Sequence, residues 1–157
     1  MCNELVITNR LLCFGDFSER ITKICALKPY GIILREKDLD EFSYEKLARQ
    51  VLALCKDQDV SCILHQFTSV AKRLSCKKIH LSFGYFKDLS FQEKTFFSTI
   101  GVSCHSLEEI LYAEKNGATY VTFSPVFKTT CKPHGAPQGL AALERVCQCS
   151  TIPIFAL

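Results

Sequence analysis

Residues that could move a proton on a bound anion gather between positions 99 and 132. Ser103 and His105 stand at the end of a predicted strand at 99–103. A neutral imidazole there could accept a proton and return it. The next predicted strand is followed by a polar group that could hold a small ligand through hydroxyls, amides and an ammonium, and its members are Thr129, Thr130, Cys131 and Lys132. The alternative is that Ser103 and His105 only bond to backbone and that 129–132 is an ordinary polar loop.

Two cations follow another predicted strand, at 31–34. Arg35 and Lys37 are two residues apart, so alternation along an extended chain points both side chains the same way. Converging cations at the carboxyl end of a strand suit a phosphate, a diphosphate or a carboxylate. The alternative is that both are exposed loop charges, neutralised by Glu36 and Asp38.

His65 and His80 also end predicted strands, so that with His105 three imidazoles could face one end of a sheet. Three histidines could suggest a metal site. Their spacing is not diagnostic and no carboxylate accompanies them, so we expect no metal.

The elements that must position these residues alternate along the chain. Seven short apolar runs predict strands at 5–7, 31–34, 61–64, 78–81, 99–103, 120–123 and 152–157. Helical patterns lie between them. One helix begins with Ser43 as a plausible N-cap, and another begins with a capping box from Ser106 to Glu109. Residues 84–97 look irregular or briefly helical. Such alternation implies parallel pairing. We therefore expect one domain, residues 1–157, with an α/β fold of the (β/α)8 TIM-barrel type that has seven strands and lacks the eighth βα unit.

Composition limits the partners. The chain has 157 residues, 48% of them hydrophobic, and a net charge of +3 without a basic run, which argues against nucleic acid. No apolar stretch approaches the ~20 residues of a membrane helix, and the start does not resemble a signal peptide, so we expect a cytoplasmic protein. Ten cysteines occur without a CxxC pair, and we interpret most, including Cys25, Cys55, Cys62 and Cys147, as buried thiols. Open strand edges would favour a homo-oligomer.

These stretches resemble the thiamine phosphate synthase/TenI family of (β/α)8 barrels over nearly the whole chain. The similarity is carried by Leu34-Arg-Glu-Lys37, by Gly101-Val-Ser-Cys-His-Ser-Leu-Glu-Glu109 and by the segment from Phe123 to Lys132. It implies that Arg35 and Lys37 bind a diphosphate and that Ser103 and Lys132 line the same site. It also implies that residues 129–131 hold a thiazole phosphate.

Three departures from the family pattern bear on the chemistry. The family's glutamine on strand two is Ile33 here, and its Asn-Asp pair after strand three is His65-Gln66. Its second magnesium aspartate meets Ser82-Phe-Gly-Tyr85, with Asp88 three residues further on. Mg²⁺ usually needs one or two carboxylates, so the resemblance favours the metal-free TenI branch, which often carries a cysteine where Cys131 stands.

The main hypothesis is a thiazole phosphate tautomerase of thiamine biosynthesis that works without a cofactor and uses His105 as proton shuttle. One alternative is a thiamine phosphate synthase, which joins hydroxymethylpyrimidine diphosphate to thiazole phosphate with Mg²⁺. The other is a non-catalytic binding or assembly protein on a degenerate barrel. The expected ligand in each case is a small phosphorylated thiazole or pyrimidine.

Overall fold

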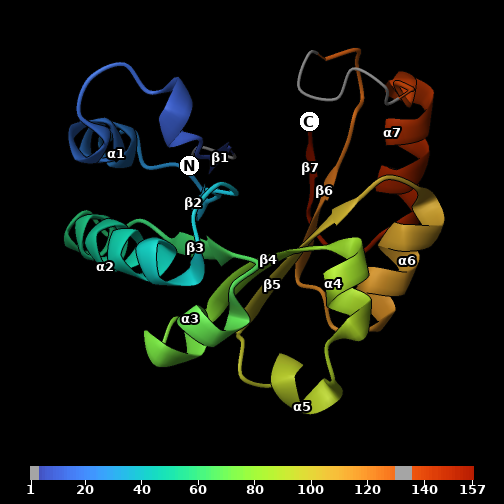
Figure 1. The fold of residues 1–157 in the computed structure, drawn as a ribbon. Helices are drawn as coiled ribbons and strands as arrows, with labels where there is room; N and C mark the ends of the chain where they lie inside the picture. Colours follow the sequence, from blue (N-terminus) through green and yellow to red (C-terminus); the bar gives the residue numbers. More distant parts are fainter. Residues whose placement is uncertain (1–3, 130–135) are drawn as a thin grey trace. The chain divides into compact units, whose positions relative to one another are not determined.

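A computed structural model describes residues 4–129 and 136–157 of the chain (Figure 1). Within these residues all seven predicted strands occur, separated by helices. The strands are β1 (Leu5–Ile7), β2 (Gly31–Leu34), β3 (Cys62–His65), β4 (Lys78–Ser82), β5 (Thr99–Cys104), β6 (Tyr120–Phe123) and β7 (Ile154–Ala156). The helices are η1 (Arg10–Leu12), α1 (Phe17–Ala26), α2 (Glu41–Asp57), α3 (Thr68–Arg73), α4 (Phe83–Asp88), α5 (Phe91–Lys94), α6 (Leu107–Lys115) and α7 (Gly139–Cys149). The chain forms two compact units, Met1–Ile79 and His80–Leu157, and each is described by itself.

In the first unit, β1 pairs with β2 and β2 with β3, both in parallel. Every residue of β2 and β3 is buried, as expected for a parallel sheet that helices cover. Helices α1 and α2 pack against each other beside these strands (Figure 1). The prediction of Ser43 as N-cap is wrong. Asp40 caps α2 instead, because its carboxylate accepts the backbone N–H of Ser43 at 2.7 Å and the helix therefore begins earlier.

In the second unit, β5 pairs with β6 and β6 with β7, again in parallel. The segment 84–97 is briefly helical, as one of the two expectations had it, because it contains most of α4 and the whole of α5, which a capping box between Ser90 and Glu93 opens. Ser106 caps α6 as predicted, and that helix ends before Gly117, whose φ of +97° favours glycine.

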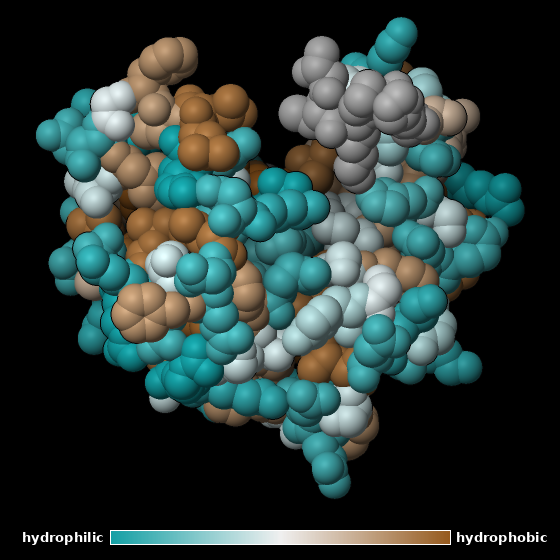
Figure 2. Space-filling view, viewed as in Figure 1, coloured by the Kyte–Doolittle hydropathy of each residue, from teal (hydrophilic) through white to brown (hydrophobic). Residues whose placement is uncertain are grey.

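The cysteine prediction is correct for Cys25, Cys55 and Cys62, which are buried, and wrong for Cys147, which is exposed on α7. Burial raises the pKa of Cys25 to about 12, so this thiol packs as a small apolar side chain. No helix within 4–129 and 136–157 is both long and apolar enough to cross a membrane. Three exposed apolar side chains of the first unit lie around η1, where Leu11, Leu12 and Phe14 are 69%, 73% and 92% exposed and hydrophobic surface shows at the upper left of Figure 2.

Candidate functional site

His105 lies at the carboxyl end of β5 and is held at two atoms. Its Nδ1 lies 2.6 Å from the carbonyl oxygen of Ser124, the residue that follows β6. Its backbone N–H donates to the carboxylate of Glu109 at 2.7 Å. The predicted capping box is therefore shifted by one residue, since Glu109 reaches back to His105 and not to Ser106. A carbonyl oxygen can only accept, so Nδ1 carries the proton and Nε2 of the neutral ring has the lone pair that can accept another.

Ser103 belongs to a hydrogen-bonded group of polar side chains, most of them buried. His80 bonds to Ser103 Oγ through Nε2 at 2.8 Å and to Tyr120 Oη through Nδ1 at 2.9 Å. Thr122, which pairs with Ser103 across β5 and β6, donates to the same Oγ at 3.4 Å. His80, Tyr120 and Thr122 are each no more than 3% exposed. These hydrogen bonds fix the Ser103 hydroxyl, because moving it would break its bonds to His80 and Thr122 inside the core.

The expectation that His80 ends a strand is wrong. It lies in the middle of β4, inside the second unit, where two hydroxyls take both of its ring nitrogens. Gly101 makes room for this arrangement. A Cβ at residue 101 would lie 2.1 Å from Cζ of Tyr120 and 2.5 Å from Nδ1 of His80. The glycine in this strand is thus explained by close approach of a neighbouring side chain.

Arg35 and Lys37 follow β2, as predicted, with Arg35 half-buried and Lys37 exposed. Neither forms an ion pair within the part of the chain that the structure describes. The alternative that Glu36 and Asp38 neutralise them is wrong, because both carboxylates turn to Arg10. The Arg10 guanidinium donates to both oxygens of Asp38, at 2.8 and 2.6 Å, and lies 3.5 Å from Glu36 Oε2.

Glu36 is the buried centre of that arrangement, at 2% exposure. It accepts the backbone N–H of Arg10 at 2.9 Å and the hydroxyl proton of Thr8. Thr8 in turn accepts the backbone N–H of Arg35 at 3.0 Å. The loops after β1 and β2 are therefore joined, and the backbone of Arg35 is held while its charge is left uncompensated.

His65 is the last residue of β3 and is 8% exposed. Burial, followed by the positive charges of Arg35 and Lys37, lowers its pKa to about 4. The ring is therefore neutral near pH 7. Its backbone N–H donates to Tyr44 Oη at 2.8 Å, and that hydroxyl donates to the carbonyl oxygen of Leu34 at 2.7 Å. Tyr44 thus ties the ends of β2 and β3 together from α2.

The other predicted site residues of the first unit lie beside these. Ile33 is fully buried on β2, where it pairs with Ile7 and Ile63. Gln66 follows His65 with a φ of +64°, and its carbonyl accepts the backbone N–H of Thr68 at 2.8 Å. The short turn after β3 therefore fixes the direction in which the chain leaves the strand.

Thr129 is half-buried and follows β6, which ends at Phe123, by several residues. Thr130, Cys131 and Lys132 lie outside the described residues. Arg35 and Lys37 belong to one compact unit and His105 to the other. A single pocket that unites them therefore stays a prediction.

The positions to which the resemblance assigns magnesium carboxylates do not fit that ion. His65 and Gln66 carry no carboxylate, and Ser82 is the N-cap of α4. Asp88 is the last residue of that helix, about 9 Å along its axis from Ser82, so it could not take the place of a carboxylate at Ser82 unless α4 unwinds. No group of three or more His, Cys, Asp or Glu within 4–129 and 136–157 is placed to hold a metal ion.

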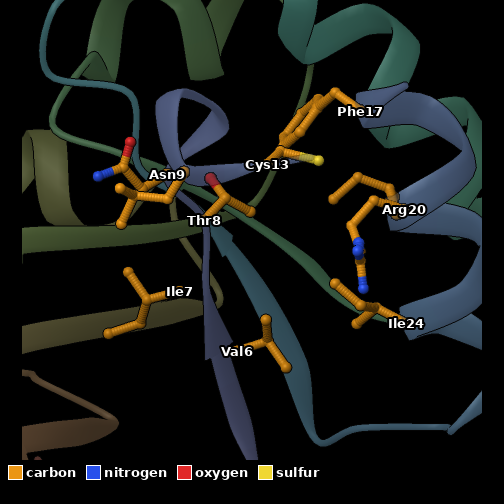
Figure 3. Close-up of a pocket in the computed structure, with 10 residues that line it drawn as sticks. Val6, Ile7, Thr8, Asn9, Cys13, Phe17, Arg20 and Ile24 are labelled. Atoms are coloured by element: carbon orange, nitrogen blue, oxygen red, sulfur yellow. The ribbon is translucent and has the colours of Figure 1, made fainter. Parts of the chain in front are cut away.

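A cavity of about 300 Å³ in the first unit contains none of the predicted site residues. Figure 3 shows Val6, Thr8 and Cys13 from β1 and the following loop on one side of it, with Arg20 and Ile24 from α1 on the other. The hydroxyl of Thr8 is already bonded to Glu36.

The strands, the uncompensated cations after β2 and the anchored imidazole after β5 define a barrel-type α/β protein with polar chemistry at the carboxyl ends of its strands. The sequence model of the thiamine monophosphate synthase family, TMP-TENI, matches residues 4–157. The chain belongs to this family, and with it to thiamine biosynthesis.

Individual relatives with curated names agree with this family assignment. A protein of Aquifex aeolicus (strain VF5), provisionally named thiamine-phosphate synthase 2, is 34% identical over 151 residues, which cover 96% of this chain and 81% of the relative. The thiamine-phosphate synthase of Bacillus licheniformis is 35% identical over 100 residues, covering 63% of this chain and 45% of the relative. The chain thus spans less than half of some relatives that it matches.

A solved structure supports the fold class. Thiamine phosphate pyrophosphorylase from Pyrococcus furiosus matches with a TM-score of 0.80 at 24% identity, covering 98% of this chain and 73% of that chain. The predicted (β/α)8-barrel type of α/β fold is therefore confirmed, with seven strands in the described residues.

Sequence reasoning did not single out Tyr44 and Tyr120 and gave Glu36 and His80 other roles, although all four position the site. All four are polar and each is at most 3% exposed. A signal was present in the strands, where His80 lies between apolar residues and Tyr120 begins a buried run. Buried polar groups need partners, so each was a candidate for such a role.

Proposed function

We propose that this chain is a metal-independent thiazole phosphate tautomerase with His105 as the proton shuttle. The observation that carries the proposal is the bond from His105 Nδ1–H to the carbonyl oxygen of Ser124. This bond selects the tautomer in which Nε2 can act as a base. In the reaction Nε2 takes the proton as a ring C–H bond breaks and returns it to another position of the same ring system. Atoms and electrons balance without an oxidant or a second substrate.

The remaining predicted residues have binding roles in this proposal. Arg35 and Lys37 attract the phosphate, and the fixed hydroxyl of Ser103 orients the ring. The segment that includes Thr129, Thr130, Cys131 and Lys132 also binds the phosphate, while Ile33 and Gln66 shape the pocket. Family membership and the uncompensated charges after β2 support these assignments.

The test measures isomerisation of the thiazole carboxylate phosphate by ¹H NMR in wild type and in His105→Ala. Loss of a general base reduces turnover by about 10²–10⁴-fold, while calorimetric binding of the product should stay within a few-fold. Lys37→Gln should show the reverse, with weaker binding and a kcat close to wild type. Lys23→Gln, at an exposed position on α1, is the control. Unchanged turnover in His105→Ala would defeat the assignment.

The second candidate is thiamine phosphate synthase, and the names of the relatives favour it. Incubation with hydroxymethylpyrimidine diphosphate, thiazole phosphate and Mg²⁺ decides between the two. Diphosphate release that depends on Mg²⁺ would establish the synthase. Isomerisation in the presence of a chelator would establish the tautomerase. Tight binding of either phosphate with neither activity would establish a non-catalytic binding protein.

Self-association and a cytoplasmic location complete the proposal. Among the described strands, β1 pairs only with β2 and β7 only with β6, which leaves an edge open on each. Light scattering would show a mass above that of a monomer if these edges associate. Fractionation of cells that produce the full protein would test the location.

A further inference from the structure

A cavity of about 500 Å³ in the second unit lies at the other end of β5 from His105. Ile100, the second residue of the strand, contributes to its lining. Residues 100 and 104 are four steps apart, which corresponds to about 13 Å along the strand. The cavity is therefore separate from the imidazole of the proposed active site.

Three lysines line this cavity: Lys87, Lys94 and Lys115. None of them forms an ion pair within the described part of the chain. Two glutamates adjacent in sequence to these lysines bond elsewhere, Glu93 to Ser90 and Glu114 to Ser150. Three positive charges thus line one concave surface, and such a surface attracts an anion.

Lys94 is the most constrained of the three. Its Nζ lies 3.8 Å from the centroid of the Phe86 ring, and partial burial lowers its pKa. Lys87 is held in a similar way, with Nζ 5.1 Å from the centroid of the Phe83 ring. Cation–π contacts fix the position of an ammonium without neutralising it. Both charges are therefore oriented in advance and remain available to a ligand.

The rest of the lining is apolar and partly aromatic. Leu89, Phe97 and Ile100 are buried and belong to the wall of the cavity. Phe91 and Tyr112, at 81% and 42% exposure, present aromatic surface at its mouth. A site of this volume with an apolar wall and aromatic edges suits a flat ring of one or two fused cycles.

We propose that this cavity is a second ligand site, for an aromatic phosphate monoester. The ring packs on the apolar wall, and the phosphate meets the ammonium groups. All three cations are lysines, which bind a phosphate as compact point charges. A phosphate dianion also matches several positive charges better than a monoanion. The inference does not depend on the tautomerase proposal.

Calorimetry with 1-naphthyl phosphate tests the site, with 1-naphthol and inorganic phosphate as probes of the two halves of the ligand. We expect 1-naphthyl phosphate to bind more tightly than either. The double variant Lys87→Gln/Lys94→Gln should weaken its binding by about ten-fold or more, since hydrogen bonds to charged groups are stronger than neutral ones. Lys23→Gln, at an exposed position on α1, is the control and should bind as wild type does, whereas Lys37→Gln reports any binding of the probe after β2.

Three results would overturn the proposal. The first is no binding of 1-naphthyl phosphate at millimolar concentration, and the second is that 1-naphthol binds as tightly as 1-naphthyl phosphate. The third is that Lys37→Gln weakens the binding while the double variant does not, which would place the probe after β2. Circular dichroism checks that the variants fold. If the double variant does not fold, Lys115→Gln at an exposed position gives the same test, because its loss alone should weaken binding several-fold.

Discussion

Replacing His65 with Asn should flatten the dependence of the unfolding free energy on pH between about 5 and 7. In the folded chain the pKa of His65 is about 4, against an ordinary value of 6.5. Burial is the larger cause, and the charges of Arg35 and Lys37 add to it. The unfolded chain therefore binds a proton on this ring at a pH where the folded chain does not. Stability is complete above about pH 6.5 and falls as the pH falls toward 4.

The size of the effect follows from the two pKa values. The gap between about 4 and 6.5, at about 1.4 kcal/mol per pKa unit, corresponds to about 3 kcal/mol in full. At pH 5 the folded ring is still mostly neutral and the unfolded ring mostly charged, so about 2 kcal/mol of this is already lost. Asparagine does not titrate, so the variant should lack this contribution and keep only the slope of the other groups.

Urea denaturation at pH 7.5 and 5.0, followed by circular dichroism, measures the difference. Working at or above pH 5 avoids most of the titration of Asp and Glu in the unfolded chain. The wild type should lose about 2 kcal/mol more between these two values than His65→Asn. Equal losses in the two proteins would refute the account of His65. As an extension, diphosphate bound at Arg35 and Lys37 adds negative charge beside the ring, so it should raise the pKa of His65 in an NMR titration.

Three further predictions concern residues that hold the site, and urea denaturation checks each of them. Tyr44→Phe removes the hydroxyl that joins the ends of β2 and β3 and should cost about 2 kcal/mol. Gly101→Ala should cost about 3 kcal/mol because the added methyl group clashes with Tyr120. Adding Tyr120→Leu to this variant should restore part of the lost stability. If Gly101→Ala alone keeps full stability, the Tyr120 ring moves aside freely. Glu36→Gln weakens the buried link to Arg10 and should cost about 1–3 kcal/mol, whereas an unchanged midpoint would show that the neutral amide replaces it fully.

The strands could be predicted almost residue by residue because each is a short apolar run between polar segments. β2 and β6 have the predicted bounds, and β5 extends one residue beyond its prediction. Helix starts were less predictable, because Asp40 and Ser43 are both good N-caps and only the folded chain shows which carboxylate or hydroxyl reaches a free N–H.

The candidate site was predictable as far as its chemical groups follow strand ends. His105, Arg35 and His65 lie directly after or at the end of β5, β2 and β3. Their partners were not predictable, since they come from distant segments: Ser124 lies 19 residues from His105, and Glu36 lies 26 residues from Arg10. Sequence spacing alone could not choose Arg10 over the adjacent Arg35 as the partner of Glu36 and Asp38.

The supports of the site share one physical feature, which explains why the chemistry was visible in the sequence and the positioning was not. Tyr44 lies beneath the ends of β2 and β3, and His80 with Tyr120 lies beneath Ser103. Each support is a polar side chain inside the core, where an unpaired group is costly and a paired one has few alternative positions. Exposed groups such as His105 can then remain reactive while buried bonds set their geometry. Changes in these buried partners should therefore alter activity through geometry, without removing any group that contacts the ligand.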